Sequence, residues 1–78
     1  MRVAVITLYT RVGCHLCEEA EAVLRQLGAG RADIRLVDID TDPQLQARYT
    51  VRVPVVEVDG VEIAEYEVDP RVVEAALR

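Results

Sequence analysis

The spacing of apolar residues changes at Cys14, and this change constrains the fold more than any other feature of the chain. Residues 3–9 (VAVITLY) are almost all apolar and rich in β-branched side chains, which is typical of a strand covered on both faces. From Leu16 to Leu27 apolar residues recur at helical spacing, and Gly28 stands where a C-terminal cap belongs. The sequence therefore predicts a strand that leads directly into an amphipathic helix.

Capping and connection signals predict the next elements. Residues 34–39 (IRLVDI) indicate a second strand, which is parallel to the first because a helix lies between them in the chain. The pairs Asp42-Pro43 and Asp69-Pro70 each join a helix-capping carboxylate to a proline, which is tolerated at the first helical position. We therefore expect a short helix that ends near Tyr49 and a last helix at the end of the chain.

A hairpin signal separates these two helices. Asp59-Gly60 lies between two apolar runs and predicts a tight turn from a strand at residues 54–58 to one that begins at Val61. The alternation of apolar residues shifts near Ala64 and Glu65, where we expect a bulge or the end of the strand. The resulting order, β-α-β-α-β-β-α, describes an α/β domain with a four-stranded mixed sheet flanked by three helices.

The length and the apolar content describe one small domain. The chain has 78 residues, and we assign residues 1–78 to a single domain with one surface site. A domain of this size buries only about 60% of its unfolded surface, so it needs a high apolar content. The hydrophobic fraction is 51%, without Phe or Trp, and predicts an aliphatic core. We expect Tyr9, Tyr49 and Tyr66 to be partly buried packing residues.

Charge and hydropathy argue against two classes of partner. The net charge is −5, and the nine basic residues are all Arg, spread along the chain as on an ordinary solvated surface. Binding to nucleic acid requires clustered cations. The apolar stretch at residues 3–8 is far too short to span a bilayer, and no cleavage-type segment follows Met1-Arg2. We expect a monomeric cytoplasmic protein that binds neither nucleic acid nor membrane.

Two cysteines occur where the predicted strand meets the predicted helix, in the sequence Cys14-His15-Leu16-Cys17. Residues i and i+3 of a helix lie about 5 to 6 Å apart on one face, a separation that a disulfide accepts. Cys14 stands at or next to the helix N-cap, where unpaired amides and the helix dipole stabilise a thiolate. Cys17 lies one turn further inside. The spacing therefore predicts Cys14 as the attacking thiol and Cys17 as the resolving thiol.

Two other interpretations of the cysteine pair stay open. Both cysteines would be inert if they were small buried hydrophobes. With His15 the pair supplies three metal ligands, but a structural zinc site usually has four, and the chain contains no further Cys or His. An iron-sulfur cluster shared across a dimer would obtain its other ligands from a second chain. We expect no metal ligand and no bound cofactor, because the thiol pair itself carries the electrons.

The residues around the pair resemble those of a known family. The run Tyr9-Thr10-Arg11-Val12-Gly13-Cys14-His15-Leu16-Cys17, with Val53-Pro54 and Asp59-Gly60, is similar to the glutaredoxin-like branch of the thioredoxin superfamily. The resemblance covers essentially the whole chain and implies a thioredoxin fold with Cys14 as the nucleophile. It implies that Pro54 is cis and faces the cysteines, and that the backbone of Val53 pairs with an extended substrate. It also implies that Arg11 helps to bind glutathione and supports the thiolate.

The chain departs from that family at two places. Glutaredoxins usually carry Pro-Tyr between their cysteines, where this chain has His15-Leu16, and a Gly-Gly pair before the last helix, where it has Tyr66-Glu67-Val68. It also lacks the Trp that precedes the cysteines of thioredoxins. Glutathione and a thioredoxin reductase therefore both stay open as the electron donor.

The sequence thus predicts a thiol-disulfide oxidoreductase that reduces a disulfide-containing protein or a low-molecular-weight disulfide. Cys14 attacks the substrate, Cys17 resolves the mixed disulfide, and glutathione or a reductase restores the pair. Two non-enzymatic alternatives remain. One is a zinc or iron-sulfur carrier, and the other is a redox-inactive thioredoxin-fold interaction module.

His15 is the only histidine of the chain and directly follows the predicted nucleophile. As an imidazolium it stabilises a neighbouring thiolate, so we predict that His15→Ala raises the pKa of Cys14. Alkylation rates of Cys14 against pH, measured with Cys17→Ser in both proteins, report this pKa. The alternative, a solvated residue with little effect on Cys14, predicts an unchanged profile.

Overall fold

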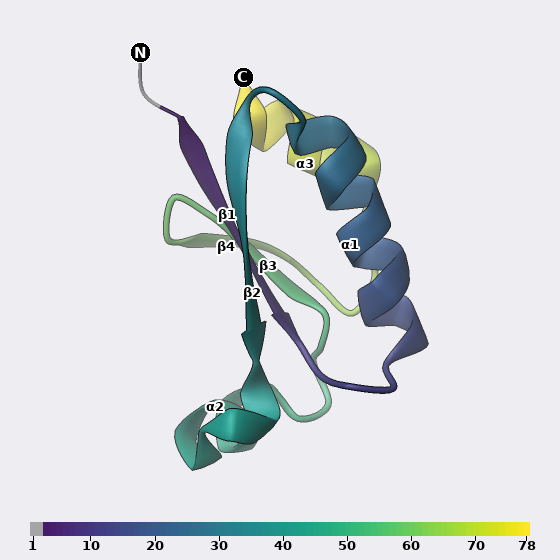
Figure 1. Cartoon of the computed structure of the whole chain (residues 1–78), viewed down its shortest axis with the longest axis vertical. Helices are drawn as coiled ribbons and strands as arrows, with labels where there is room; N and C mark the ends of the chain where they lie inside the picture. Colours follow the sequence, from purple (N-terminus) through teal and green to yellow (C-terminus); the bar gives the residue numbers. More distant parts are fainter. Residues whose placement is uncertain (1–2) are drawn as a thin grey trace.

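The computed structural model describes residues 3–78, and its helices and strands follow the predicted order (Figure 1). The expectation about Met1-Arg2 lies outside the described residues, and the assignment of residues 1–78 to one domain stays a prediction. The elements are β1 (Ala4–Thr10), α1 (His15–Gly28), β2 (Ala32–Asp38), the 3-10 helix η1 (Ile39–Thr41), α2 (Pro43–Tyr49), β3 (Val55–Val58), β4 (Val61–Glu65) and α3 (Pro70–Leu77).

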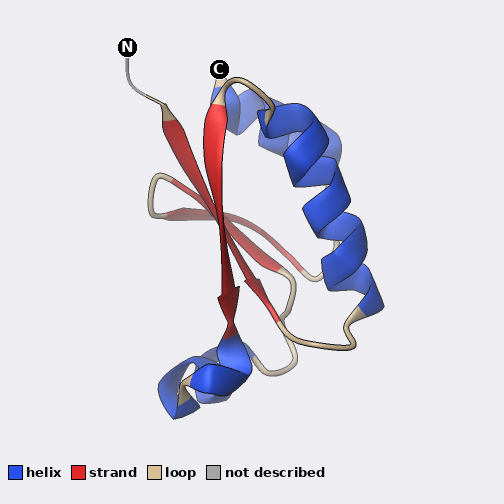
Figure 2. Ribbon diagram, in the orientation of Figure 1, coloured by secondary structure: helices blue, strands red, loops and turns tan. Residues whose placement is uncertain are grey.

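The four strands form one mixed sheet in the order β2-β1-β3-β4. β1 pairs with β2 in parallel, and β3 pairs antiparallel with both β1 and β4. The crossover through α1 accounts for the parallel pair, because a strand cannot return in parallel through a tight turn. The predicted α/β fold, with a four-stranded mixed sheet and three α-helices, is therefore confirmed (Figure 2).

One face of the sheet carries the main core. α1 and α3 both cover this face (Figure 1). The buried side chains come from β1, β3, α1 and α3 and are all aliphatic: Ile6, Leu8, Val56, Val58, Ala20, Leu24 and Val73. Each large aliphatic side chain stabilises the fold by about 1.5 to 3 kcal/mol when fully buried. The predicted aliphatic core is confirmed.

The opposite face of the sheet is polar in its middle, and the prediction that the first strand is covered on both faces is wrong. Ile6 is fully buried, but Val5 and Thr7 on either side of it are only half-buried. Thr7 is aligned with Arg35 on β2 and with Glu57 on β3, so charged side chains flank the strand here. The reason is that α2 lies beyond the end of β2 instead of across the sheet (Figure 2).

Gly28 has a packing role, and the prediction that it caps α1 is wrong. It is the last residue of α1 and is buried. A Cβ at this position would lie 3.4 Å from the Ile6 Cδ1 and 3.5 Å from the Ile34 Cδ1. The left-handed backbone that turns the chain away occurs at Gly30, with φ 75°. The sequence pattern therefore identified a glycine-dependent helix end but assigned the turn to the wrong glycine.

Carboxylates begin the two shorter helices, as predicted. Asp42 is the N-cap of α2 and accepts a hydrogen bond from the Gln44 N–H at 2.8 Å. Asp69 is the N-cap of α3 and accepts one from the Arg71 N–H at 2.9 Å. These bonds satisfy amides that have no partner within the helix.

The hairpin between β3 and β4 forms at the predicted turn. Asp59 and Gly60 both adopt left-handed backbone, with φ 52° and 86°. The Asp59 carboxylate also accepts a hydrogen bond from the Val5 N–H at 3.0 Å, which ties the turn to β1. The pairing register shifts at Ile63, which forms a bulge, and β4 ends at Glu65. Both features occur where the sequence pattern changed.

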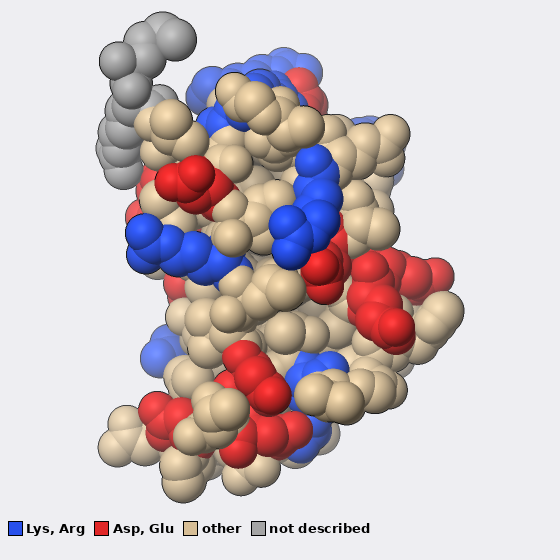
Figure 3. Space-filling view, viewed as in Figure 1, with Lys and Arg blue, Asp and Glu red and all other residues tan. Residues whose placement is uncertain are grey.

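The surface of the described chain carries mixed charge. On the face shown in Figure 3, the arginine side chains are separated from one another by acidic and uncharged residues. This distribution agrees with the prediction of an ordinary solvated surface. None of the helices formed by residues 3–78 has the length and apolar character needed to cross a bilayer.

Glycine substitutions separate the roles of Gly28 and Gly30. We predict that Gly30→Ala lowers the free energy of unfolding by about 1 kcal/mol, because a side chain disfavours left-handed backbone. Gly28→Ala is expected to be neutral or to stabilise the protein by up to about 1 kcal/mol, since the added Cβ fits and alanine favours the helix. Urea unfolding followed by circular dichroism measures both. Equal losses in the two variants would show that a Cβ at residue 28 does not fit beside Ile6 and Ile34.

Candidate active site

Cys14 is the N-cap of α1, as its position in the sequence predicted. Its backbone is extended, with φ −92° and ψ 106°, and its Sγ accepts a hydrogen bond from the Cys17 N–H at 3.2 Å. This amide is one of the N–H groups that the first turn of a helix leaves without a backbone partner. A thiolate at Cys14 is therefore stabilised by a direct N–H contact and by the positive end of the helix.

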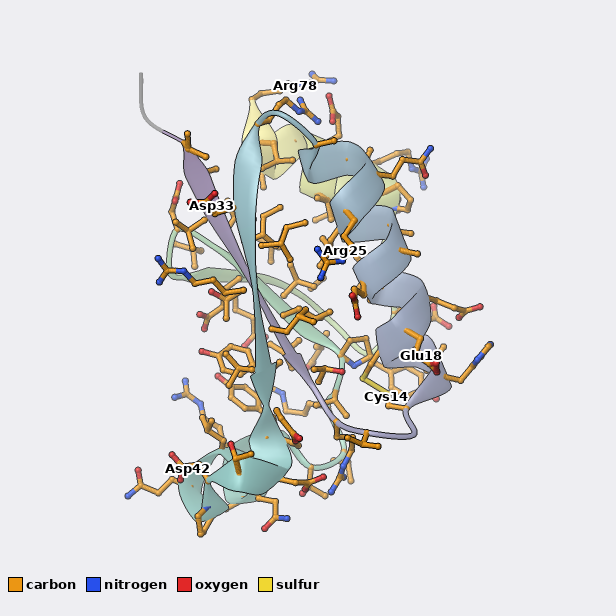
Figure 4. The ribbon with its side chains drawn as sticks, viewed as in Figure 1. Cys14, Glu18, Arg25, Asp33, Asp42 and Arg78 are labelled. Carbon is orange, nitrogen blue, oxygen red and sulfur yellow. A yellow bond between two sulfur atoms is a disulfide. The ribbon has the colours of Figure 1, made fainter. Side chains whose placement is uncertain are left out.

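A tight loop connects Cys14 to β1. Gly13 adopts φ 80°, and the Cys14 N–H donates to the Arg11 carbonyl at 3.4 Å, which closes the turn. Val12, in this loop, is 89% exposed. Cys14 therefore lies at a corner of the molecule, where β1 leads into α1 (Figure 4).

The two cysteines form a disulfide with a Cα–Cα separation of 5.2 Å, within the range that the spacing predicted. Cys14 is half-buried, whereas Cys17 is only 1% exposed. In the reduced protein this difference favours Cys14 as the thiol that a large substrate reaches. Cys17 belongs to a second buried cluster, which we call the Cys17 cluster and which also contains Ile39, Tyr49, Val53 and Val55.

Two stacked tyrosines belong to the surroundings of Cys17. The ring centroids of Tyr9 and Tyr49 lie 4.5 Å apart, and Tyr9 packs against the Cys17 cluster. The Tyr9 hydroxyl donates to the Glu57 Oε1 at 3.3 Å, and burial together with the Glu57 charge raises the pKa of Tyr9. The expected partial burial is confirmed for Tyr9 only. Tyr49 is 1% exposed and Tyr66 is 56% exposed.

Pro54 follows a cis peptide bond from Val53, as the resemblance implied, and both residues are buried. Val53 belongs to the Cys17 cluster, so this segment packs beside the cysteine pair. The Val53 N–H donates to the Tyr49 carbonyl at 3.2 Å. Because the Val53 amide already has a partner, only the Val53 carbonyl oxygen can take part in the predicted pairing with an extended substrate.

Arg11 is held by groups other than the thiol. Its guanidinium donates to the Asp40 carboxylate at 2.7 and 3.2 Å and to the Thr50 carbonyl at 3.2 Å. The hydrogen bond from Arg11, with a second from Gln46, holds the pKa of Asp40 below its usual value. Arg11 thus ties the Cys14 loop to η1 and to the end of α2. Its support of the thiolate and its contact with glutathione stay predictions.

His15 points into solvent at the start of α1. Its side chain is 83% exposed, and its Nε2 lies 3.5 Å from the Glu19 Oε1. Because Glu19 offsets the charge of a protonated imidazole, the structure favours the alternative stated above, a solvated His15 with little effect on Cys14. Within residues 3–78 no group of three or more His, Cys, Asp or Glu side chains is arranged to hold a metal ion.

A groove of about 450 Å³ runs along α1 from Leu16, the residue between the two cysteines in the chain, and sequence reasoning did not find it. One wall comes from α1 and the other from the connection between β4 and α3. These segments are far apart in the chain, and no local pattern joins them. The lining residues are Leu16, Glu19, Ala20, Val23, Tyr66, Glu67, Val68 and Pro70.

Solved structures with the same fold define the class of protein. The chain is similar to a protein from Nitrosomonas europaea studied by solution NMR, with 33% identity and a TM-score of 0.85 over 100% of this chain and 95% of that chain. It also shares its fold with a mutant thioredoxin from Halobacterium salinarum, with 24% identity and a TM-score of 0.68 over 95% of this chain and 71% of that chain. The chain therefore has a thioredoxin fold with a cysteine pair at the start of α1.

The family follows from sequence. The model of the glutaredoxin-like domain (DUF836) matches residues 5–78. The chain is also 34% identical over 70 residues to an uncharacterised protein of Mycobacterium tuberculosis, with 82% of this chain and 72% of that protein covered. The 78-residue chain therefore belongs to the glutaredoxin-like domain family. The predicted resemblance is confirmed.

The pH dependence of stability tests the contact between Arg11 and Asp40. Because the pKa of Asp40 is lowered from 3.8 in the folded protein, the ion pair stabilises the fold fully above that value. The stabilisation is lost as the pH falls through the lowered pKa. We predict that Asp40→Asn melts at a lower temperature than the wild type at neutral pH, and that the difference shrinks as the pH falls below 3.8.

Asp33→Asn is the matched control, since Asp33 is an exposed carboxylate near the start of β2, away from Cys14 (Figure 4). This variant should melt close to the wild type at neutral pH. A difference between wild type and Asp40→Asn that persists in acid would show that the ion pair is not its cause.

Proposed function

We propose that this protein is a dithiol thiol-disulfide oxidoreductase that reduces protein or low-molecular-weight disulfides. The observation that carries the proposal is the unequal placement of two bonded cysteines. Cys14 Sγ lies at the N-terminus of α1 on an exposed corner, whereas Cys17 is one turn away and 1% exposed. This placement separates an attacking sulfur from a resolving one, which is what a two-thiol mechanism requires.

In the first step the Cys14 thiolate attacks one sulfur of the substrate disulfide. The substrate S–S bond breaks, a disulfide forms between Cys14 and the substrate, and the other substrate sulfur leaves as a thiolate that takes up a proton. The Cys17 N–H, 3.2 Å from the Cys14 Sγ, stabilises the attacking charge. The Val53 carbonyl accepts a hydrogen bond from the backbone of the substrate beside Pro54.

In the second step Cys17 loses its proton and its sulfur attacks the Cys14 Sγ. The mixed disulfide breaks, the second substrate thiol leaves, and the disulfide between Cys14 and Cys17 forms. The substrate has then gained two electrons and two protons. The Cα–Cα separation of 5.2 Å supports this step, because the sulfurs can bond without unwinding the first turn of α1.

An external thiol donor must return two electrons to the pair. We infer that the protein acts in a reducing compartment such as the cytoplasm, where thiol donors are abundant. A disulfide reductase fits this site better than glutathione does. The cation assigned to glutathione by resemblance, Arg11, is already bound to Asp40 and Thr50.

The proposal predicts that both cysteines are needed and that their variants fail in different ways. Wild-type protein should accelerate the reduction of insulin by dithiothreitol, and Cys14→Ser should not, because the attacking sulfur is gone. Cys17→Ser should accumulate a mixed disulfide at Cys14, which mass spectrometry detects as the added mass of the substrate thiol.

The double variant, with both cysteines changed to serine, gives the background rate, and circular dichroism confirms that each variant is folded. If both single variants reduce insulin as fast as the wild type, the oxidoreductase proposal is wrong. Zinc or iron that copurifies in proportion to the protein, and is lost in Cys14→Ser, would favour the metal carrier instead.

A further inference from the structure

The groove between α1 and the connection from β4 to α3 reaches the first turn of α1, where the two cysteines are located. Leu16, which stands between Cys14 and Cys17, lines the groove, and Ala20 and Val23 continue the same wall along α1. Its volume of about 450 Å³ lies in the range of sites that hold small ligands or a few side chains. A segment bound in the groove would therefore contact Leu16, the residue that lies between the two cysteines in the chain.

The second wall of the groove is hydrogen-bonded to the segment that contains Pro54. Tyr66 has φ 65°, an uncommon backbone for tyrosine, and its N–H donates to the Pro54 carbonyl at 2.8 Å and to the Arg52 carbonyl at 3.0 Å. Tyr66 is 56% exposed. The wall that contains Tyr66 is thus hydrogen-bonded to the segment that packs beside Cys17.

The lining of the groove is apolar along its walls. Leu16, Val23, Val68 and Pro70 contribute aliphatic surface, and Tyr66 adds an exposed ring. Apolar surface that is open to water gains about 25 cal/mol per Å² when a partner covers it. The groove therefore favours a segment that brings an apolar side chain.

The charged residues that line the groove are all acidic. Glu19 and Glu67 are its charged lining residues, and none of the described arginines lines it. The Glu19 side chain is 60% exposed, and its neighbour is the His15 imidazole. Arg11, which follows β1, is occupied by Asp40. The groove therefore attracts cations and repels carboxylates.

We propose that this groove binds an extended segment of a substrate protein in which an apolar side chain and a lysine or arginine lie beside the disulfide cysteine. The apolar side chain packs near Leu16 and Val68, and the cation faces Glu19 and Glu67. This inference rests on the oxidoreductase function proposed above and identifies its substrates as disulfides in basic segments. Glutathione, which carries two carboxylates and one ammonium group, is disfavoured by the same charges.

Two peptide disulfides that differ only in one charge test the proposal. Acetyl-Leu-Lys-Cys-amide and acetyl-Leu-Glu-Cys-amide are each joined through cysteine to thionitrobenzoate. Cys14 attacks the peptide sulfur and releases coloured thionitrobenzoate, and Cys17 then releases the peptide thiol, so the reduced protein supplies both electrons. We expect the lysine peptide to react about tenfold faster at low salt, with a ratio that falls as salt is added.

Two variants with the same change in net charge test whether the groove causes the preference for the lysine peptide. Glu67→Lys should abolish the preference for the lysine peptide. Asp33→Lys makes the same change in net charge on β2, outside the groove, and should retain most of it. Equal rates for the two peptides with wild-type protein would overturn the proposal, and so would equal losses of preference in the two variants.

Binding without chemistry separates this proposal from the oxidoreductase function. Titration of the oxidised, isotope-labelled protein with acetyl-Leu-Lys-Ser-amide should shift the amide NMR signals of Leu16, Val23 and Tyr66. Titration with acetyl-Leu-Glu-Ser-amide should not shift them. A protein that reduces insulin but shows no such shifts retains its function and loses the groove as the docking surface. Shifts at the groove in a protein without turnover would support the docking surface and overturn the oxidoreductase proposal.

Discussion

The hydrogen bond from the Cys17 N–H to the Cys14 Sγ is the contact on which the site depends. It exists because α1 begins directly after a tight loop, so that an amide left unpaired by helix geometry points at the sulfur. The loop is positioned by β1, which pairs with β2 on one edge and with β3 on the other. A strand held on both edges gives the first turn of α1 a fixed support, and the cysteines keep a separation at which their disulfide can open and close.

The two cysteines differ because the protein packs differently on the two sides of the helix start. Cys17 is buried in one cluster with Tyr49 and Val53, so its thiol is shielded, whereas Cys14 remains half-buried at the corner. This shielding depends on α2, which lies at the end of the sheet and carries Tyr49. The same displacement of α2 leaves the middle of one sheet face polar. One feature of the fold therefore accounts both for the burial of Cys17 and for the open face.

The charges around the cysteine pair support the proposed preference for basic substrates. The positive end of α1 stabilises the thiolate, but the side chains that surround it supply little further positive charge, because Arg11 is paired with Asp40 and His15 faces Glu19. The groove next to Leu16 is lined by two glutamates. Its distribution of charge is opposite to what an anionic tripeptide such as glutathione needs and complementary to a basic protein segment.

The sequence by itself determined the order of elements, the Asp42 and Asp69 caps, the Asp59-Gly60 turn and the place of Cys14, because each depends on hydrogen bonds or spacing within a few residues. Only the tertiary structure decided that Gly28 packs against Ile6, that α2 lies beyond the sheet, and that the Val53 amide and Arg11 have partners. It also formed the groove between Leu16 and Tyr66. These features join residues far apart in the chain, and their contacts are set by how whole elements pack, which no local pattern records.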